Sequence, residues 1–198
     1  MNQRRFRIGA WGLALIMAST ALAASGEVGV ERLVDFTGNA EPWPSIDDVV
    51  MGGVSNSDMV VEGGTAVFRG DLSVARGGGF CSVRSRPGAY DLTGYSALII
   101  RVRGDGNRYR LRLRTTTAFD GISYESTFAT SAGSWQEIEL PLASFRPVFR
   151  GREVSGAPPL DPERVVTFGL LISDRQVGPF RLEIEWIAGR VGAGRADG

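Results

Sequence analysis

Hydrophobic and polar residues alternate with a period of two along much of the chain, and glycine-rich or proline-rich stretches separate the alternating segments. This period is typical of half-buried β-strands, and no long segment has the spacing of an amphipathic helix. Short strands with frequent turns predict an all-β protein, a sandwich of strands. The expected strands cover residues 59–62, 66–69, 80–85, 98–103, 108–114, 124–129, 136–140, 167–172 and 180–186, and residues 144–162 are expected to form a long loop.

The clearest predicted unit is an antiparallel hairpin over residues 98–114. Apolar residues alternate with polar ones on both sides of Gly104-Asp105-Gly106-Asn107, which has the composition of a turn. A four-residue turn would place Arg101 opposite Arg110, on the face that points away from the core. The hairpin therefore predicts a stripe of arginines from both strands on one outer face.

Like charges directly opposite each other are unfavourable, so this arginine stripe requires negative charges beside it. Glu137 and Glu139 alternate with apolar residues in one expected strand, and Glu183 and Glu185 do so in another. If these strands lie beside the hairpin, the glutamates neutralise the stripe as exposed ion pairs. An anionic ligand or a partner surface is the alternative.

The first 23 residues have a basic start, an apolar stretch and the small-residue pattern Ala21-Leu22-Ala23. These features are typical of a secretory signal peptide, and the apolar stretch is shorter than the roughly 20 residues that span a bilayer. We therefore expect a cleaved signal peptide at residues 1–23, one domain at 24–188 and a flexible tail at 189–198. The expected location is periplasmic or secreted, without a stable membrane anchor.

Composition excludes several classes of function. The chain has 22 basic and 22 acidic residues, and removing Arg4, Arg5 and Arg7 leaves 19 basic residues, a balance that does not favour a nucleic-acid partner. Histidine is absent and Cys81 is the only cysteine, which excludes Ser-His-Asp and Cys-His catalysis and metal sites built from histidine or thiolate. We expect no cofactor, no metal and no enzymatic activity. A carboxylate pair, or a hard cation held by oxygen ligands, is the weaker alternative.

Two glycine-rich segments, residues 47–57 and 76–80, contain polar residues that require hydrogen-bond partners. Neither is a phosphate-binding loop, because that loop requires a lysine and the chain has none. The glycines either permit positive φ and close backbone contacts, or they border a ligand surface or hard-cation site around Asp47 and Asp48. Polar residues in such glycine-bounded motifs need internal partners or a ligand. The predicted partner- or ligand-binding residues are Asp47, Asp48, Ser55 and Asn56 of the first segment, Arg84 after the second, and Asp174, Arg175 and Gln176 of a third motif near the end of the chain.

The same segments belong to a series of motifs that occur in order along the chain. The motifs are Trp43 with Asp47-Asp48-Val49-Val50-Met51-Gly52-Gly53-Val54-Ser55, Gly78-Gly79-Phe80-Cys81-Ser82-Val83-Arg84, Asp91-Leu92-Thr93-Gly94-Tyr95, Arg101-Val102-Arg103-Gly104-Asp105-Gly106, Trp135-Gln136 with Leu140-Pro141, and Gly169-Leu170-Leu171-Ile172-Ser173-Asp174-Arg175-Gln176 with Gly178-Pro179-Phe180. Over about residues 34–187 this series resembles the NADH:ubiquinone oxidoreductase intermediate-associated protein 30 family.

The resemblance implies a galactose-binding-like jelly-roll β-sandwich. It also implies a non-enzymatic assembly chaperone that binds a protein partner, such as a subunit of a respiratory complex or another envelope protein. Because many carbohydrate-binding modules share this fold, the alternative is a carbohydrate-binding module-like protein of the cell envelope. Its candidate sugar-contacting aromatic residues are Trp43, Trp135, Tyr109 and Tyr124.

Overall fold

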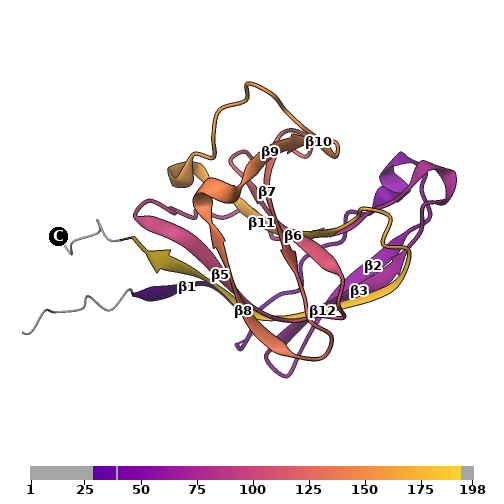
Figure 1. Cartoon of the computed structure of the whole chain (residues 1–198), viewed down its shortest axis with the longest axis horizontal. Helices are drawn as coiled ribbons and strands as arrows, with labels where there is room; N and C mark the ends of the chain where they lie inside the picture. The colour runs from indigo at the N-terminus through magenta and orange to yellow at the C-terminus, as the bar shows by residue number, and fades with distance from the viewer. Residues whose placement is uncertain (1–28, 39, 193–198) are drawn as a thin grey trace, which may run out of the picture.

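The computed structural model describes residues 29–38 and 40–192, which form two antiparallel sheets packed face to face (Figure 1). The first sheet has the order β2-β3-β12-β5-β8, with β1 also paired to β12, and the second has the order β10-β9-β7-β6-β11-β4. The strands of the first sheet are β1 (Val30–Asp35), β2 (Asn56–Glu62), β3 (Thr65–Leu72), β5 (Tyr95–Arg103), β8 (Trp135–Pro141) and β12 (Gly178–Val191). Those of the second are β4 (Cys81–Arg84), β6 (Arg108–Arg114), β7 (Ser123–Ala129), β9 (Arg146–Phe149), β10 (Arg152–Glu153) and β11 (Thr167–Ile172).

Helical structure in the described residues is limited to four short 3₁₀ turns: η1 (Asp48–Met51), η2 (Ala75–Gly77), η3 (Leu142–Ser144) and η4 (Pro162–Arg164). The prediction of an all-β sandwich is therefore confirmed. Within the same residues, no helix is long and apolar enough to cross a membrane. The expected loop at 144–162 also contains β9 and β10, which the sequence pattern did not predict.

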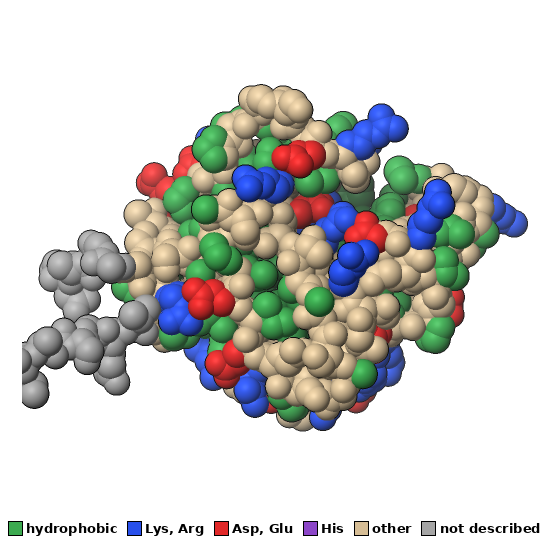
Figure 2. All heavy atoms as spheres, viewed as in Figure 1, with side chains coloured by type: hydrophobic (Ala, Val, Ile, Leu, Met, Phe, Trp, Pro, Cys, Tyr) green, Lys and Arg blue, Asp and Glu red, His purple; other side chains and the backbone are tan. Residues whose placement is uncertain are grey.

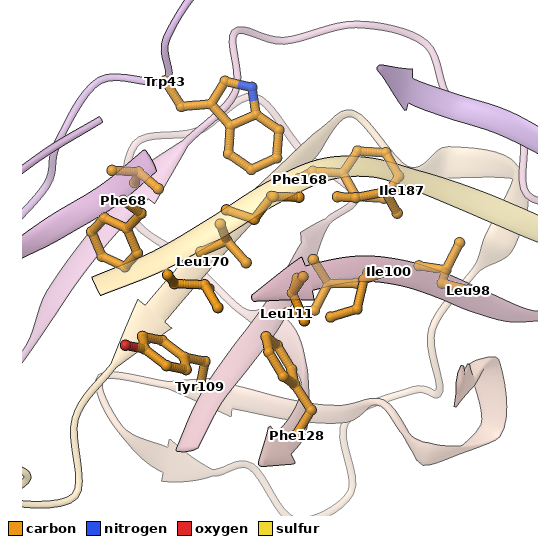
Figure 3. Close-up of a cluster of buried hydrophobic side chains, with 14 of the residues drawn as sticks. Trp43, Phe68, Leu98, Ile100, Tyr109, Leu111, Phe128, Phe168, Leu170 and Ile187 are labelled. Atoms are coloured by element: carbon orange, nitrogen blue, oxygen red, sulfur yellow. The ribbon is translucent and has the colours of Figure 1, made fainter. Parts of the chain in front are cut away.

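The core lies between the two sheets and is made by every second residue of the central strands (Figure 3). Tyr109 and Leu111 of β6 are fully buried, as are Phe168 of β11 and Ile100 of β5. The ring of Phe168 also packs edge-on against Tyr90, with 4.8 Å between the ring centroids. A period of two on both inner faces thus brings the apolar side chains together.

The predicted hairpin over residues 98–114 is wrong, because β5 and β6 lie in different sheets. β5 pairs with β12 and β8, whereas β6 pairs with β7 and β11. The connection 104–107 crosses the end of the sandwich from one sheet to the other. A Cβ on Gly104 would lie 2.3 Å from Thr130 Oγ1, so the backbone can pass this close to Thr130 only at a glycine. The Asp105 carboxylate fixes the crossing by accepting hydrogen bonds from the Tyr109 hydroxyl and the Arg181 backbone.

The separation of β5 from β6 also divides the predicted arginine stripe between two outer faces. On the first sheet, Arg101 pairs with Glu185 at 2.6 Å and with Glu137 at 3.2 Å, and Arg103 pairs with Glu183. The ion-pair interpretation is therefore confirmed for Arg101 and Arg103. The arginines of β6 lie on the opposite face of the molecule, away from these glutamates.

The C-terminal boundary predicted at residue 188 is also wrong. β12 continues to Val191, and Gly189 and Arg190 pair with residues of both β1 and β5. Backbone pairing on both sides therefore holds residues that the sequence pattern assigned to a flexible tail. The predicted signal peptide at residues 1–23 lies outside the described residues.

Replacing Phe168 with alanine tests the core. We expect Phe168→Ala to lower the free energy of unfolding by about 3–5 kcal/mol, because the change removes a fully buried ring and leaves a cavity. Urea denaturation followed by tryptophan fluorescence measures this loss. Val177→Ala, at an exposed position, is the control and should change the free energy by no more than about 0.5 kcal/mol. Equal midpoints for the two variants would contradict the assignment of Phe168 to the core.

Candidate functional site

A cleft of about 650 Å³ lies on the outer face of the second sheet. Its floor is formed by outward-facing residues of β4, β6, β7 and β11, and its walls by the glycine-rich segment 77–79, η1 and the loop that follows β6. Figure 2 shows the surface hollowed at the upper right, with charged side chains beside the hollow. We call this feature the arginine cleft, after Arg84, Arg110, Arg112 and Arg114, which line it.

Strand register places the charged residues of the floor in a row. Arg84 of β4 and Arg112 of β6 both pair with Gly169 of β11, one on each side, and Arg112 pairs in turn with Glu125 of β7. Because alternate side chains of a strand point to the same face, Arg110 and Arg114 lie beside Arg112 on the outer face. Four guanidinium groups from two strands therefore share one concave surface.

Glu125 is the carboxylate that neutralises part of this charge. Its side chain is buried, and it lies 3.3 Å from Arg110 and 2.9 Å from Arg112. Ser123 also donates a hydrogen bond to it at 3.1 Å. Asp174 makes a second contact to Arg110, at 2.6 Å. Arg110 and Arg112 thus have acidic partners within the cleft.

Arg84 and Arg114 are stabilised differently. Arg114 is buried and donates hydrogen bonds to the backbone carbonyls of Ala118, Phe119 and Gly121, and Arg84 donates one to Phe119. Among the described residues neither guanidinium forms an ion pair with a carboxylate. Burial, together with the neighbouring positive charges of Arg114 and Arg112, lowers the pKa of Arg84 to about 10.

The predicted residues of the first glycine-rich segment form a hydrogen-bond network behind the wall of the cleft. The fully buried Asp48 carboxylate accepts hydrogen bonds from the backbone and hydroxyl of Ser55, and from the backbone of Gly79 and Phe80. A Cβ at Gly78 would lie 2.4 Å from this carboxylate, so the contact requires glycine. Asp48 therefore joins η1 to the segment 77–80.

Asp47 has a similar internal role. It is buried, and it accepts hydrogen bonds from Ser57 Oγ at 2.7 Å and from the Ser82 backbone at 3.0 Å. Burial raises the pKa of Asp47 above its ordinary value, and the two hydrogen bonds oppose that rise. In the part of the chain that the structure describes, acidic and cysteine side chains form no group of three that could hold a metal ion.

The remaining predicted site residues are dispersed. Arg84 and Asp174 line the arginine cleft, whereas Asn56 is exposed on β2. Arg175 is exposed beside Asp174 in the turn after β11, where both residues have positive φ. Gln176 donates hydrogen bonds to the carbonyls of Arg108 and Ser173, so its amide stabilises that turn. The cleft thus combines two of the predicted binding residues with Glu125 and with Arg110, Arg112 and Arg114, which were predicted only as members of the arginine stripe.

The family model for complex I intermediate-associated protein 30 matches residues 34–184. The chain belongs to this family. It is 30% identical over 168 residues to the mitochondrial complex I intermediate-associated protein 30 of Mus musculus, a match that covers 74% of this chain and 51% of the mouse protein. The corresponding Drosophila melanogaster protein is 34% identical over 110 residues, which cover 52% of this chain and 36% of that protein. The chain therefore spans about half of the mouse protein and about a third of the Drosophila protein.

Solved structures confirm the fold. The family 11 carbohydrate-binding module of a Clostridium thermocellum cellulosomal cellulase superposes with a TM-score of 0.63 at 19% identity, over 83% of this chain and 96% of the module. At this identity the likeness concerns the fold alone. The predicted galactose-binding-like jelly-roll sandwich is thus the architecture of the chain.

The predicted periplasmic or secreted location is contradicted by these comparisons. The mouse, Drosophila and Caenorhabditis elegans relatives are all named as mitochondrial proteins, which points to mitochondria. A basic start that lacks acidic residues is shared by secretory signals and mitochondrial transit peptides, so this feature of residues 1–23 does not separate the two destinations.

The Asp48 network predicts a stability difference that depends on pH. Burial alone would raise the pKa of Asp48, but the hydrogen bonds from Ser55, Gly79 and Phe80 hold this pKa below its ordinary value. The ionised carboxylate therefore stabilises the fold above the unfolded-state pKa of about 4, and this stabilisation is lost as the pH falls through the lower folded-state pKa.

We accordingly expect Asp48→Asn to lower the free energy of unfolding by about 2–3 kcal/mol at pH 7, with the gap to the wild type narrowing below about pH 4. Urea denaturation at a series of pH values measures the gap. Asp71→Asn, at an exposed position, is the matched control. A gap that stays constant down to pH 2 would show that the charge of Asp48 does not stabilise the fold.

Glu125 gives a second prediction, on the charge of the cleft floor. We expect Glu125→Gln to lower the free energy of unfolding by about 2 kcal/mol, because it leaves Arg112 without a carboxylate and Arg110 with Asp174 alone. Thermal and urea denaturation measure the change. Glu163→Gln, at an exposed position on η4, should have no measurable effect. Equal stabilities for these variants would mean that Glu125 does not neutralise the cluster.

Proposed function

We propose that the protein is a non-enzymatic binding protein that associates with a protein partner during the assembly of a respiratory complex. The observation that carries this proposal is the family match over residues 34–184, which includes strands of both sheets. The family is described by its association with an assembly intermediate of complex I and not by a reaction. The arginine cleft is the concave surface that we assign to the partner.

The chemistry of the cleft supports a binding role. Its acidic residues, Asp120, Glu125 and Asp174, each contact an arginine. For Asp120, the hydrogen bond from Arg150 holds the pKa below its ordinary value. A carboxylate stabilised in this way is a poor proton donor near neutral pH, and the chain has no histidine to replace it.

A carbohydrate-binding function is the second candidate, because the sandwich superposes on a carbohydrate-binding module. Sugar recognition commonly uses exposed aromatic rings. Of the four aromatic candidates, Trp43, Tyr109 and Tyr124 are buried in the core. Trp135 lies beneath Arg101 and Arg103 on the first sheet, away from the cleft. These positions favour the protein partner.

The experiment is crosslinking and purification of the tagged, full-length protein from its own organism, followed by mass spectrometry. We expect enrichment of subunits of NADH:ubiquinone oxidoreductase, because the family is described by association with its intermediate. Purified protein is applied to a glycan array in parallel.

Two controls define the result. The tag alone gives the background, and Phe168→Ala identifies proteins that are captured by unfolded chains. Enrichment of complex subunits above both controls supports the proposal. Enrichment equal to the controls contradicts it, and specific glycan binding without an enriched subunit assigns the protein to carbohydrate recognition instead.

A further inference from the structure

A notch of about 10 Å³ opens in the floor of the arginine cleft. It forms at Gly169 of β11, which has no side chain to cover the outer face of the strand. The notch lies between Arg84 on one neighbouring strand and Arg112 on the other. Its lining is completed by Arg114, Thr167, Ser82 and Val83. A space of this size accommodates about one water-sized atom, such as a single oxygen of a larger group.

Buried polar atoms beside the notch have no hydrogen-bond partner. Arg114 Nε and Thr167 Oγ1 belong to side chains whose residues are only 5% and 3% exposed, and no described residue bonds to either atom. Arg112 Nε lies 2.9 Å from Glu125 but lacks the alignment of a hydrogen bond. Native proteins satisfy nearly all buried polar groups, so Arg114 Nε and Thr167 Oγ1 require an oxygen from an ordered water or from a bound ligand.

The charge around the notch favours an anion. Glu125 is shared by Arg110 and Arg112, and Asp120 is engaged by Arg150. Among residues 29–38 and 40–192, Arg84 and Arg114 form no ion pair, and the Asp120 carboxylate that attracts them both is bound to Arg150. Burial first, and then repulsion from Arg114 and Arg112, lowers the pKa of Arg84, and a bound carboxylate would relieve that repulsion.

The rim of the cleft has a different character from its floor. Val50 and Met51 of η1 and Phe119 of the opposite wall line the cleft, yet they are 59%, 61% and 66% exposed. Large apolar side chains at this exposure, gathered around one cleft, mark a contact surface. A ligand that fits both parts has a carboxylate flanked by apolar groups.

We propose that the notch at Gly169 binds a side-chain carboxylate from an acidic segment of the partner protein, whose flanking apolar residues pack against the rim. This inference rests on the proposed function, since it specifies the chemistry of the partner. One carboxylate oxygen occupies the notch beside Thr167 and Arg114, and the other faces Arg84. The open cleft leaves room for the chain on either side of the acidic residue.

The first test uses purified full-length protein and a fluorescein-labelled peptide, acetyl-Gly-Leu-Asp-Glu-Leu-Gly-amide, in a fluorescence polarisation titration. We expect this peptide to bind at least about tenfold more tightly than its analogue with Asn and Gln, because only the acidic peptide forms charge-assisted hydrogen bonds. Its affinity should fall as sodium chloride is raised. Inorganic phosphate and oligogalacturonate are titrated as competitors, to distinguish a peptide carboxylate from other anions.

Two variants separate binding from folding. Thr167→Val removes a hydroxyl that has no hydrogen-bond partner, so the melting temperature should be unchanged or raised, whereas peptide affinity should fall about fivefold. Arg84→Gln relieves repulsion with Arg112 and Arg114, so it should also retain the fold, and we expect affinity to fall at least about tenfold. Arg164→Gln, an exposed arginine on η4, is the control and should change neither quantity.

Equal binding of the acidic and amide peptides, or full affinity in Arg84→Gln and Thr167→Val, would overturn the inference. Binding of phosphate or oligogalacturonate without the peptide would overturn it as well, since it assigns the notch to another anion. The crosslinking experiment, repeated with Arg84→Gln, separates the two proposals. If wild type and variant capture the same subunits, the proposed function stands and the notch has no role; if the wild type captures none, the proposed function fails.

Discussion

Burial of Tyr109, Leu111 and Leu113 between the sheets determines where the arginines of β6 lie. Alternate side chains of a strand point to opposite faces, so Arg110 and Arg112 must lie on the outer face whenever their neighbours enter the core. The hydrophobic contacts that stabilise the sandwich therefore also hold like charges beside one another. The cleft, its buried glutamate and its polar notch all follow from this constraint.

The same alternation explains which parts of the fold the sequence could predict. It identified the strands over 98–103, 108–114, 167–172 and 180–186, because each has a continuous apolar face. It could not assign their partners, since pairing depends on how the connections cross the sandwich. The connection 104–107 resembles a hairpin turn in composition, yet the hydrogen bonds of Asp105 to groups of both sheets determine its path. β9 and β10 were missed for a related reason, as short strands among prolines have no clear period.

The site was predictable only in part. Asp47 and Asp48 were singled out because acidic residues among glycines require partners, and the structure supplies those partners from Ser55, Ser57 and nearby backbone groups. A sequence does not distinguish an internal partner from a ligand. The arginines of β6 did carry a signal, their alternation with apolar residues, but the assumed hairpin joined them to Arg101 and Arg103. Only the separation of β5 and β6 into two sheets shows that the expected glutamates lie beside Arg101 and Arg103 and not beside the arginines of β6.

The two outer faces of the molecule provide an internal comparison. On the first sheet Arg101 and Arg103 are paired with glutamates of the neighbouring strands, which is the arrangement expected of a surface that only needs to be soluble. On the second sheet Glu125 serves two arginines, while Arg84 and Arg114 depend on backbone carbonyls. Both faces arise from one chain under the same folding constraints, so the alternation of strands alone does not account for the difference. The unneutralised charge at Gly169, beside buried polar atoms without partners, is thus the feature of the fold that a bound carboxylate would complete.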